Sequence, residues 1–201
     1  MIAFESQPEL GDHLLRVKGS FVPDNLTIVN KGLSSAPGTL RLHLGKVGSG
    51  GASFHYVSHK AVDSVDVPVV TLDQYIADNP HGPVAFVKSD VEGQELDVFR
   101  GAEETLGQYG PDLAFECHHA EAENGELFAF LTGLGYRGAF FFVRPEDHRR
   151  YRTRGHGRYL PFEEFDGPPY PRPGVRHRNY AFIKDEERYL DLLEKRWPQG
   201  D

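Results

Sequence analysis

Residues 84–93 read Val84-Ala85-Phe86-Val87-Lys88-Ser89-Asp90-Val91-Glu92-Gly93. The first four residues are apolar, and such a run predicts a strand buried on both faces of a parallel sheet. After the turn, apolar residues recur at helical spacing, at Leu96, Phe99, Ala102 and Leu106. The stretch therefore predicts a buried strand, a polar turn and one amphipathic helix, which is the repeating unit of an α/β fold.

The sequence on either side continues this alternation of strands and helices. Towards the N-terminus it predicts helices that begin at Pro8 and after a Thr71 cap, and strands at residues 1–4, 26–30, 39–44 and 65–70. Towards the C-terminus it predicts a helix at residues 123–133, a terminal helix at 185–197, and strands at 112–117, 139–143 and 180–183. Pro68 is expected at an edge or a break of its strand, because proline cannot donate to a sheet.

These elements predict one α/β domain over residues 1–201, with a mostly parallel sheet and an antiparallel strand near the C-terminus. Its core is expected at residues 1–143 and 179–184, with a loop-rich insertion at 144–178 and a terminal helix in residues 185–201. The glycine-rich residues 46–53 lack the strand before and the helix after that a phosphate-binding loop requires, so a plain loop is expected there.

Composition and charge narrow the class of protein. The net charge is −8, and a field of that sign repels phosphate backbones, so nucleic-acid binding is disfavoured. No apolar run approaches the roughly 20 residues of a membrane helix, so no membrane association is expected. Cys117 is the single cysteine, which fits a reducing compartment and favours the cytoplasm. The arginine-rich segment between Arg144 and Arg158 is either a solvated loop or a patch for an anionic substrate.

Polar residues follow three of the predicted strands, where ligands of open α/β sheets bind. Glu5 follows the first strand and is either a ribose ligand or an exposed acid. Asp90 and Glu92 follow the strand of the opening stretch, where a helix cap explains one acid better than two. Glu116 and His118 lie on one side of their strand end and are candidates for a general base or a metal site.

Several segments together resemble the FkbM family of methyltransferases. The central signature of that family is an apolar strand, a Lys-x-Asp-x-Glu-Gly turn and a helix with Glu-Leu and a Lys/Arg-Gly-Ala step, and residues 87–102 are similar to it throughout. Ala3-Phe4-Glu5-Ser6-Gln7-Pro8 is similar to the Ala-Phe-Glu-Pro-x-Pro segment of the family, and Val70-Thr71-Leu72-Asp73 to its Thr-Leu-Asp. The resemblance covers residues 1–143 and a last strand at 179–184.

The resemblance implies a Rossmann-like fold and S-adenosylmethionine as cofactor. It implies that Glu5 holds the cofactor ribose, that Leu33 and Ser34 border the adenine, and that Asp90 also faces the cofactor. Asp90, Glu92, Glu116 and His118 are then the candidates for acceptor binding and general base. The expected reaction is transfer of a methyl group to an oxygen of a small molecule or a glycan.

In the family, the Ala-Phe-Glu strand follows another strand, a glycine-rich turn that holds the methionine part of the cofactor, and a helix. The printed sequence starts at the second strand, so this N-terminal strand–helix unit is predicted to be missing and the chain to be a fragment. The two strands beside the missing strand would then have unpaired backbone edges, which predicts a homo-oligomer through exposed sheet edges. Two alternatives stay open: a non-catalytic fragment or interaction module, and a metal-dependent hydrolase that uses Asp90, Glu116, His118 and His119.

Overall fold

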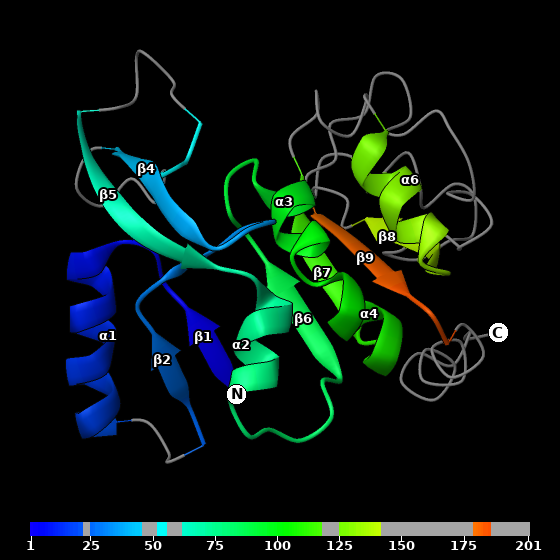
Figure 1. Cartoon of the computed structure of the whole chain (residues 1–201), viewed down its shortest axis with the longest axis horizontal. Coiled ribbons are helices and arrows are strands. Elements are labelled where there is room, and N and C mark those ends of the chain that lie inside the picture. The colour runs from blue at the N-terminus through cyan, green and yellow to red at the C-terminus, as the bar shows by residue number, and fades with distance from the viewer. Residues whose placement is uncertain (22–24, 46–51, 56–61, 118–124, 142–178, 186–201) are drawn as a thin grey trace, which may run out of the picture. The chain divides into compact units, whose positions relative to one another are not determined.

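The computed structural model describes residues 1–21, 25–45, 52–55, 62–117, 125–141 and 179–185 (Figure 1). The chain forms two compact units, and each is described by itself. The first unit comprises Met1–Gly82 and Val91–Thr105, and the second comprises Pro83–Asp90 and Leu106–Asp201. The predicted insertion at 144–178 and the predicted terminal helix beyond residue 185 lie outside the described residues, as do residues 46–51 of the glycine-rich loop.

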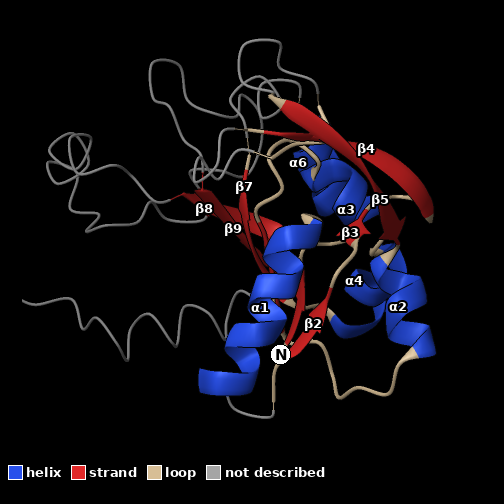
Figure 2. Cartoon of the chain, turned by 90° about the vertical axis from the view of Figure 1, so that its left-hand side faces the viewer, coloured by secondary structure: helices blue, strands red, loops and turns tan. Residues whose placement is uncertain are grey.

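The first unit begins with a strand–helix–strand segment, as predicted. Strands β1 (Ile2–Phe4) and β2 (Thr27–Val29) pair in parallel, and helix α1 (Pro8–Phe21) connects them. Pro8 is the first residue of α1, where its missing N–H costs no hydrogen bond. Both views show α1 running along the two strands (Figure 2). A Cβ atom at Gly11 would lie 2.5 Å from Cγ of Asn30, so the glycine lets α1 approach the end of β2 closely.

A second sheet of the first unit contains a pairing that the sequence did not predict. Its order is β3 (Gly32–Leu33), β5 (Asp63–Val70) and β4 (Gly38–Leu44), with β3 parallel and β4 antiparallel to β5. Strand β5 continues through Pro68, so of the two predicted alternatives, an edge or a break, the break does not occur. Pro68 pairs with Thr39 of β4, whereas β3 begins only beside Val69, so at Pro68 the strand has one described neighbour. A proline is tolerated there because the other side demands no donor.

The helix predicted after Gly93 is two helices, α3 (Glu95–Arg100) and α4 (Glu103–Tyr109). The prediction of one helix is wrong because Asp73 provides a second helix start. Asp73 follows Thr71, which caps α2 (Leu72–Asp78) as predicted with a 3.0 Å bond from Gln74 N–H. The Asp73 carboxylate accepts the N–H groups of Glu104 at 3.0 Å and Thr105 at 2.8 Å. These are donors that an isolated helix start leaves unsatisfied.

The second unit holds the sheet that confirms the predicted fold class. Its order is β6 (Phe86–Ser89), β7 (Asp112–Glu116), β9 (Asn179–Ile183) and β8 (Arg137–Phe141). β6 and β7 are parallel, and β9 runs antiparallel to both of its neighbours. The chain therefore has a Rossmann-like α/β fold with parallel strands and the predicted antiparallel strand near its C-terminus.

Strand β6 is not the fully buried strand that its apolar run predicts. It begins at Phe86, and the side chain of Phe86 is 59% exposed. In the described part of the chain β6 pairs only with β7, so it is an edge strand. An apolar run identifies a strand but does not say whether both of its neighbours are present.

Aromatic residues fill the core of the second unit. The ring of Phe115 on β7 stacks on Tyr180 of β9 at 5.7 Å between centroids, and Phe128 of α6 (Glu126–Gly133) meets Tyr180 edge-on at 5.0 Å. Tyr136 is fully buried, and its hydroxyl donates to the carbonyl of Pro111 at 2.9 Å. The hydroxyl of Tyr180 is also buried but finds no hydrogen-bond partner among the described residues. No described helix is long and apolar enough to cross a membrane.

A buried carboxylate organises the turn after β6. Glu95 has no exposed surface, and its two oxygens accept the N–H groups of Val91 and Gly93, each at 3.0 Å. A buried charge is tolerated only when such hydrogen bonds replace its hydration. Glu95 thereby fixes the backbone of residues 91–93 from within the first unit.

Replacing either buried tyrosine with phenylalanine tests this account of the core. Tyr136→Phe should lower the free energy of unfolding by about 1–2 kcal/mol, because the Pro111 carbonyl loses its donor. Tyr180→Phe should leave stability unchanged or raise it, because it removes a buried hydroxyl that has no partner in the described part of the chain. Urea unfolding followed by circular dichroism measures both, and equal losses in the two variants would contradict the assignment.

Glu95→Gln should destabilise the chain by about 2–3 kcal/mol, because the amide NH₂ would face a backbone N–H where an acceptor is needed. Glu103→Gln is the matched control: it makes the same change at an exposed position and should stay within about 0.5 kcal/mol of the parent. Urea unfolding is again the measurement. A Glu95→Gln chain as stable as the control would show that the turn does not depend on this carboxylate.

Candidate functional site

The predicted acids at the strand ends of the second unit lie along one edge of its sheet. Ser89 of β6 pairs with Phe115 of parallel β7, so Asp90 and Glu116 follow at the same carboxyl edge. Asp90 is exposed, and its Oδ2 forms an ion pair with Nζ of Lys88 at 3.2 Å. Glu116 is half-buried. His118 and His119 lie outside the described residues, so their predicted roles beside Glu116 stay predictions.

Glu92 adopts a backbone conformation that side chains avoid. Its φ is 52°, and Gly93 follows with a φ of 99°. Among the described residues Glu92 is the one non-glycine with a positive φ, a conformation that costs about 1–2 kcal/mol. Such strain persists only where surrounding contacts enforce it, and it is concentrated at functional sites.

Two residues from the segment after β4 support this strained turn. The hydroxyl of Ser53 donates to the carbonyl of Glu92 at 2.8 Å, and Nε2 of His55 lies 2.9 Å from the carbonyl of Gly93. Ser53 is itself fixed to β4 by two backbone bonds with His43, of 2.9 and 3.0 Å. The turn is therefore held by Glu95 on one side and by Ser53 and His55 on the other.

The Nε2 atom of His55 also lies 2.9 Å from the side-chain nitrogen of Gln94. The carbonyl of Gly93 requires a donor at Nε2, whereas an amide NH₂ requires an acceptor there. Turning the Gln94 amide over makes the two contacts compatible, because the single N–H at Nε2 then lies between two acceptor oxygens. In either orientation one end of the Gln94 amide is hydrogen-bonded to His55.

Glu5 directly follows β1 in the first unit, as predicted, and its side chain bonds to the segment that leads into α1. Its Oε1 accepts the N–H of Gln7 at 2.7 Å. Its Oε2 makes no hydrogen bond with any described residue. One oxygen is thus committed to the fold and the other is left for a ligand.

Leu33 is the last residue of the short strand β3, which follows β2, and Ser34 comes directly after it. Leu33 is half-buried, and Ser34 is 7% exposed with its N–H bonded to the Val70 carbonyl at 3.0 Å. The carbonyl of Ser34 packs against Gly101, where a Cβ atom would lie 2.1 Å from that oxygen. Ser34 therefore has a fixed position, set by β5 and by the turn between α3 and α4.

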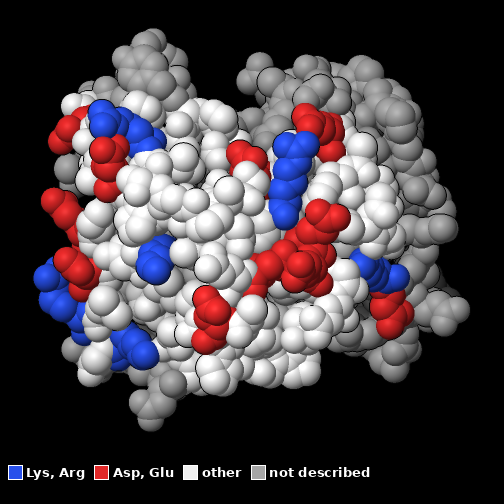
Figure 3. Space-filling view, in the orientation of Figure 1, with Lys and Arg blue, Asp and Glu red and all other residues white. Residues whose placement is uncertain are grey.

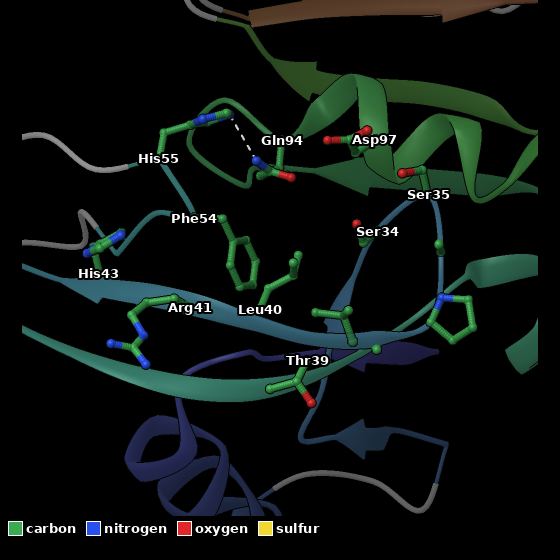
Figure 4. A pocket seen from close by; sticks show the side chains of 14 residues that line it. Ser34, Ser35, Thr39, Leu40, Arg41, His43, Phe54, His55, Gln94 and Asp97 are labelled. Carbon is green, nitrogen blue, oxygen red and sulfur yellow. Dashed lines mark hydrogen bonds between the residues drawn. The ribbon is translucent and has the colours of Figure 1, made fainter.

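A pocket of about 530 Å³ opens within the first unit (Figure 4). Its walls come from the β3–β4 turn, from β4, from Phe54 and His55, and from the start of α3. Of the predicted site residues, Ser34 lines this pocket, whereas Glu5, Leu33 and Glu92 do not. The sequence did not single out His55, Gln94 or Asp97, which do. Its volume lies in the ordinary range of small-molecule sites.

The charged groups near β4 neutralise each other. Arg41 forms a forked contact with Asp66 across β4 and β5, with Nε 2.7 Å from Oδ1 and Nη2 3.0 Å from Oδ2. The hydrogen bonds from Arg41 lower the pKa of Asp66, and those to Asp66 raise the pKa of Arg41. Figure 3 shows basic and acidic side chains side by side over these two strands. Both partners are more than half exposed, so the pair contributes little to stability.

No group of three histidine, cysteine or acidic side chains with the geometry of a metal site occurs among the residues that the structure describes.

Comparison with known proteins identifies the family. The methyltransferase FkbM domain matches residues 3–137. No curated protein matches the sequence significantly. Among solved structures, the crystal structure of methyltransferase FkbM from Methylobacillus flagellatus KT is similar, with 14% sequence identity and a TM-score of 0.49. The match covers 90% of this chain and 36% of that chain, so this chain spans about a third of that protein's length.

The family match takes in more than half of the sequence and includes Glu5, the turn after β6 and the end of β7. The chain therefore belongs to the methyltransferase FkbM domain family.

Proposed function

We propose that the chain serves S-adenosylmethionine-dependent transfer of a methyl group to an oxygen of a small molecule or a glycan. The observation that carries the proposal is the turn at Glu92 and Gly93, which is strained and held by hydrogen bonds from Glu95, Ser53 and His55. It lies inside the segment that matches the family. A fold that maintains strain at a strand end does so for function more often than for stability.

The residues of the first unit fit part of the cofactor. Oε2 of Glu5 is left without a partner among the described residues, so it can accept a hydrogen bond from a ribose hydroxyl. Ser34 is held in place through its backbone, and half-buried Leu33 precedes it with an apolar side chain. We assign these two residues to the adenine, and the resemblance to the family carries the assignment of Asp90 to the cofactor.

When bound, S-adenosylmethionine supplies a methyl group that its sulfonium already activates. The protein then has to align the acceptor oxygen and remove its proton. Asp90 and Glu116 are suited to this because both follow parallel strands at one sheet edge. We assign acceptor binding and the general base to this pair together with Glu92 and His118.

The single cysteine and the acidic charge agree with an enzyme of the cytoplasm that acts on a small molecule or a glycan rather than on nucleic acid. The described edges of β1 and β6, each paired on one side, are where we expect a second copy of the chain to associate. The main competing function is that of a non-catalytic interaction module.

Titration of the purified chain with S-adenosylmethionine in a calorimeter tests the proposal. We expect binding, and we expect Glu5→Gln to weaken it about tenfold, because one charged hydrogen bond to the ribose is lost. Glu9→Gln removes the same charge from an exposed position on α1 and should bind like the parent. Undetectable binding to the parent chain would favour the non-catalytic module, and equal affinity in both variants would refute the role of Glu5.

A further inference from the structure

Two largely buried residues on the wall of the first unit's pocket have hydrogen-bonding capacity that no described residue uses. Gln94 and Ser34 are each 7% exposed. The end of the Gln94 amide that does not face His55 has no hydrogen bond with a described residue, and neither does the Ser34 hydroxyl. Both groups lie on the pocket wall, where a molecule in the pocket can form hydrogen bonds with them.

Asp97 adds an unpaired carboxylate to the same wall. It lies three residues after Gln94, so the two side chains share one face of α3. The Asp97 carboxylate and the hydroxyl of Ser35 form no hydrogen bond or ion pair with a described residue. Figure 4 shows His55, Gln94, Asp97 and Ser35 along one side of the pocket. A carboxylate can accept hydrogen bonds from two neighbouring hydroxyl groups at once.

The opposite side of the pocket is apolar. The ring of Phe54 and the side chain of Leu40 face the polar row in Figure 4, and buried Val69 also lines the pocket. Phe54 is held closely, because a Cβ atom at Gly32 would lie 3.0 Å from its Cζ. A fixed ring opposite hydrogen-bonding groups suits a ligand that has an apolar face and a rim of hydroxyls.

The pocket has little to offer a phosphate or a carboxylate. Arg41 is the one arginine or lysine among its lining residues, and both of its contacting nitrogens are committed to Asp66. The unpaired charge that remains, on Asp97, repels anions. Neutral groups outnumber this single charge, since an amide and two hydroxyls await partners beside it.

We propose that this pocket binds a neutral ring with adjacent hydroxyl groups, such as a pyranose. The proposal goes beyond the methyl-transfer function and does not rest on it. Asp97 and Gln94 hold the hydroxyls, and Phe54 lies against the ring. Gln94 directly follows the strained turn, so the segment that carries Glu92 also contributes to this pocket.

Saturation-transfer NMR on the whole chain tests the pocket without any methyl transfer. The probes are the methyl glycosides of glucose, galactose, mannose and rhamnose, with glucosamine and glucose 6-phosphate as charged counterparts. At least one neutral glycoside should bind, and Asp97→Asn should weaken it about tenfold. Asp78→Asn, at the exposed end of α2, is the matched control and should leave the affinity unchanged. Phe54→Leu should also weaken binding while it keeps an apolar wall.

Three results would overturn the proposal: no saturation of any neutral glycoside, equal affinity in Asp97→Asn and Asp78→Asn, or tighter binding of either charged sugar than of its neutral counterpart. The cofactor titration is independent of this measurement. A chain that binds a glycoside but not S-adenosylmethionine keeps the sugar site and loses the methyltransferase function. A chain that binds S-adenosylmethionine but no glycoside keeps the methyltransferase function and loses the sugar site.

Discussion

The carboxylate of Glu95 is the interaction on which the rest of the site depends. A buried charge is tolerated only with donors around it, and here two of those donors are the N–H groups of Val91 and Gly93. The same two hydrogen bonds therefore stabilise the buried carboxylate and determine the shape of the turn. Glu92 is forced into a left-handed backbone conformation because the residues on both sides of it are bonded to the same side chain.

Because of this arrangement, the residues proposed to bind a ligand lie on short segments that β4 and α3 hold in position. Ser53 and His55 reach the turn from the end of a β-bridge to β4, and Gln94 continues it into α3. The carbonyl groups of Glu92 and Gly93 are thereby occupied, and the far end of the Gln94 amide lies on the pocket wall. The same few hydrogen bonds thus connect the family's signature turn to a pocket that the signature does not mention.

The sequence predicted most of the strands, the starts of α1 and α2, and the turn, because each depends on local chemistry: an apolar run, a proline in a first turn or a threonine cap. The sequence did not predict features that depend on residues far away in the chain. The break between α3 and α4 depends on Asp73, thirty residues earlier in the chain, and the exposure of Phe86 depends on which strands flank β6. Ser53 and His55 carry no recognisable motif, because their role comes only from meeting Glu92 and Gly93 in space.

The contact between the Ser34 carbonyl and Gly101 gives the Arg-Gly-Ala step of the signature a physical meaning. An oxygen 2.1 Å from the position of a Cβ atom excludes even alanine, and that oxygen belongs to the backbone, which cannot rotate away as a side chain can. In evolutionary terms, position 101 can be occupied only by glycine for as long as the backbone of Ser34 keeps its position. The φ of Gly101 is −75°, which any residue can adopt, so the glycine reflects this tertiary contact rather than its own backbone conformation.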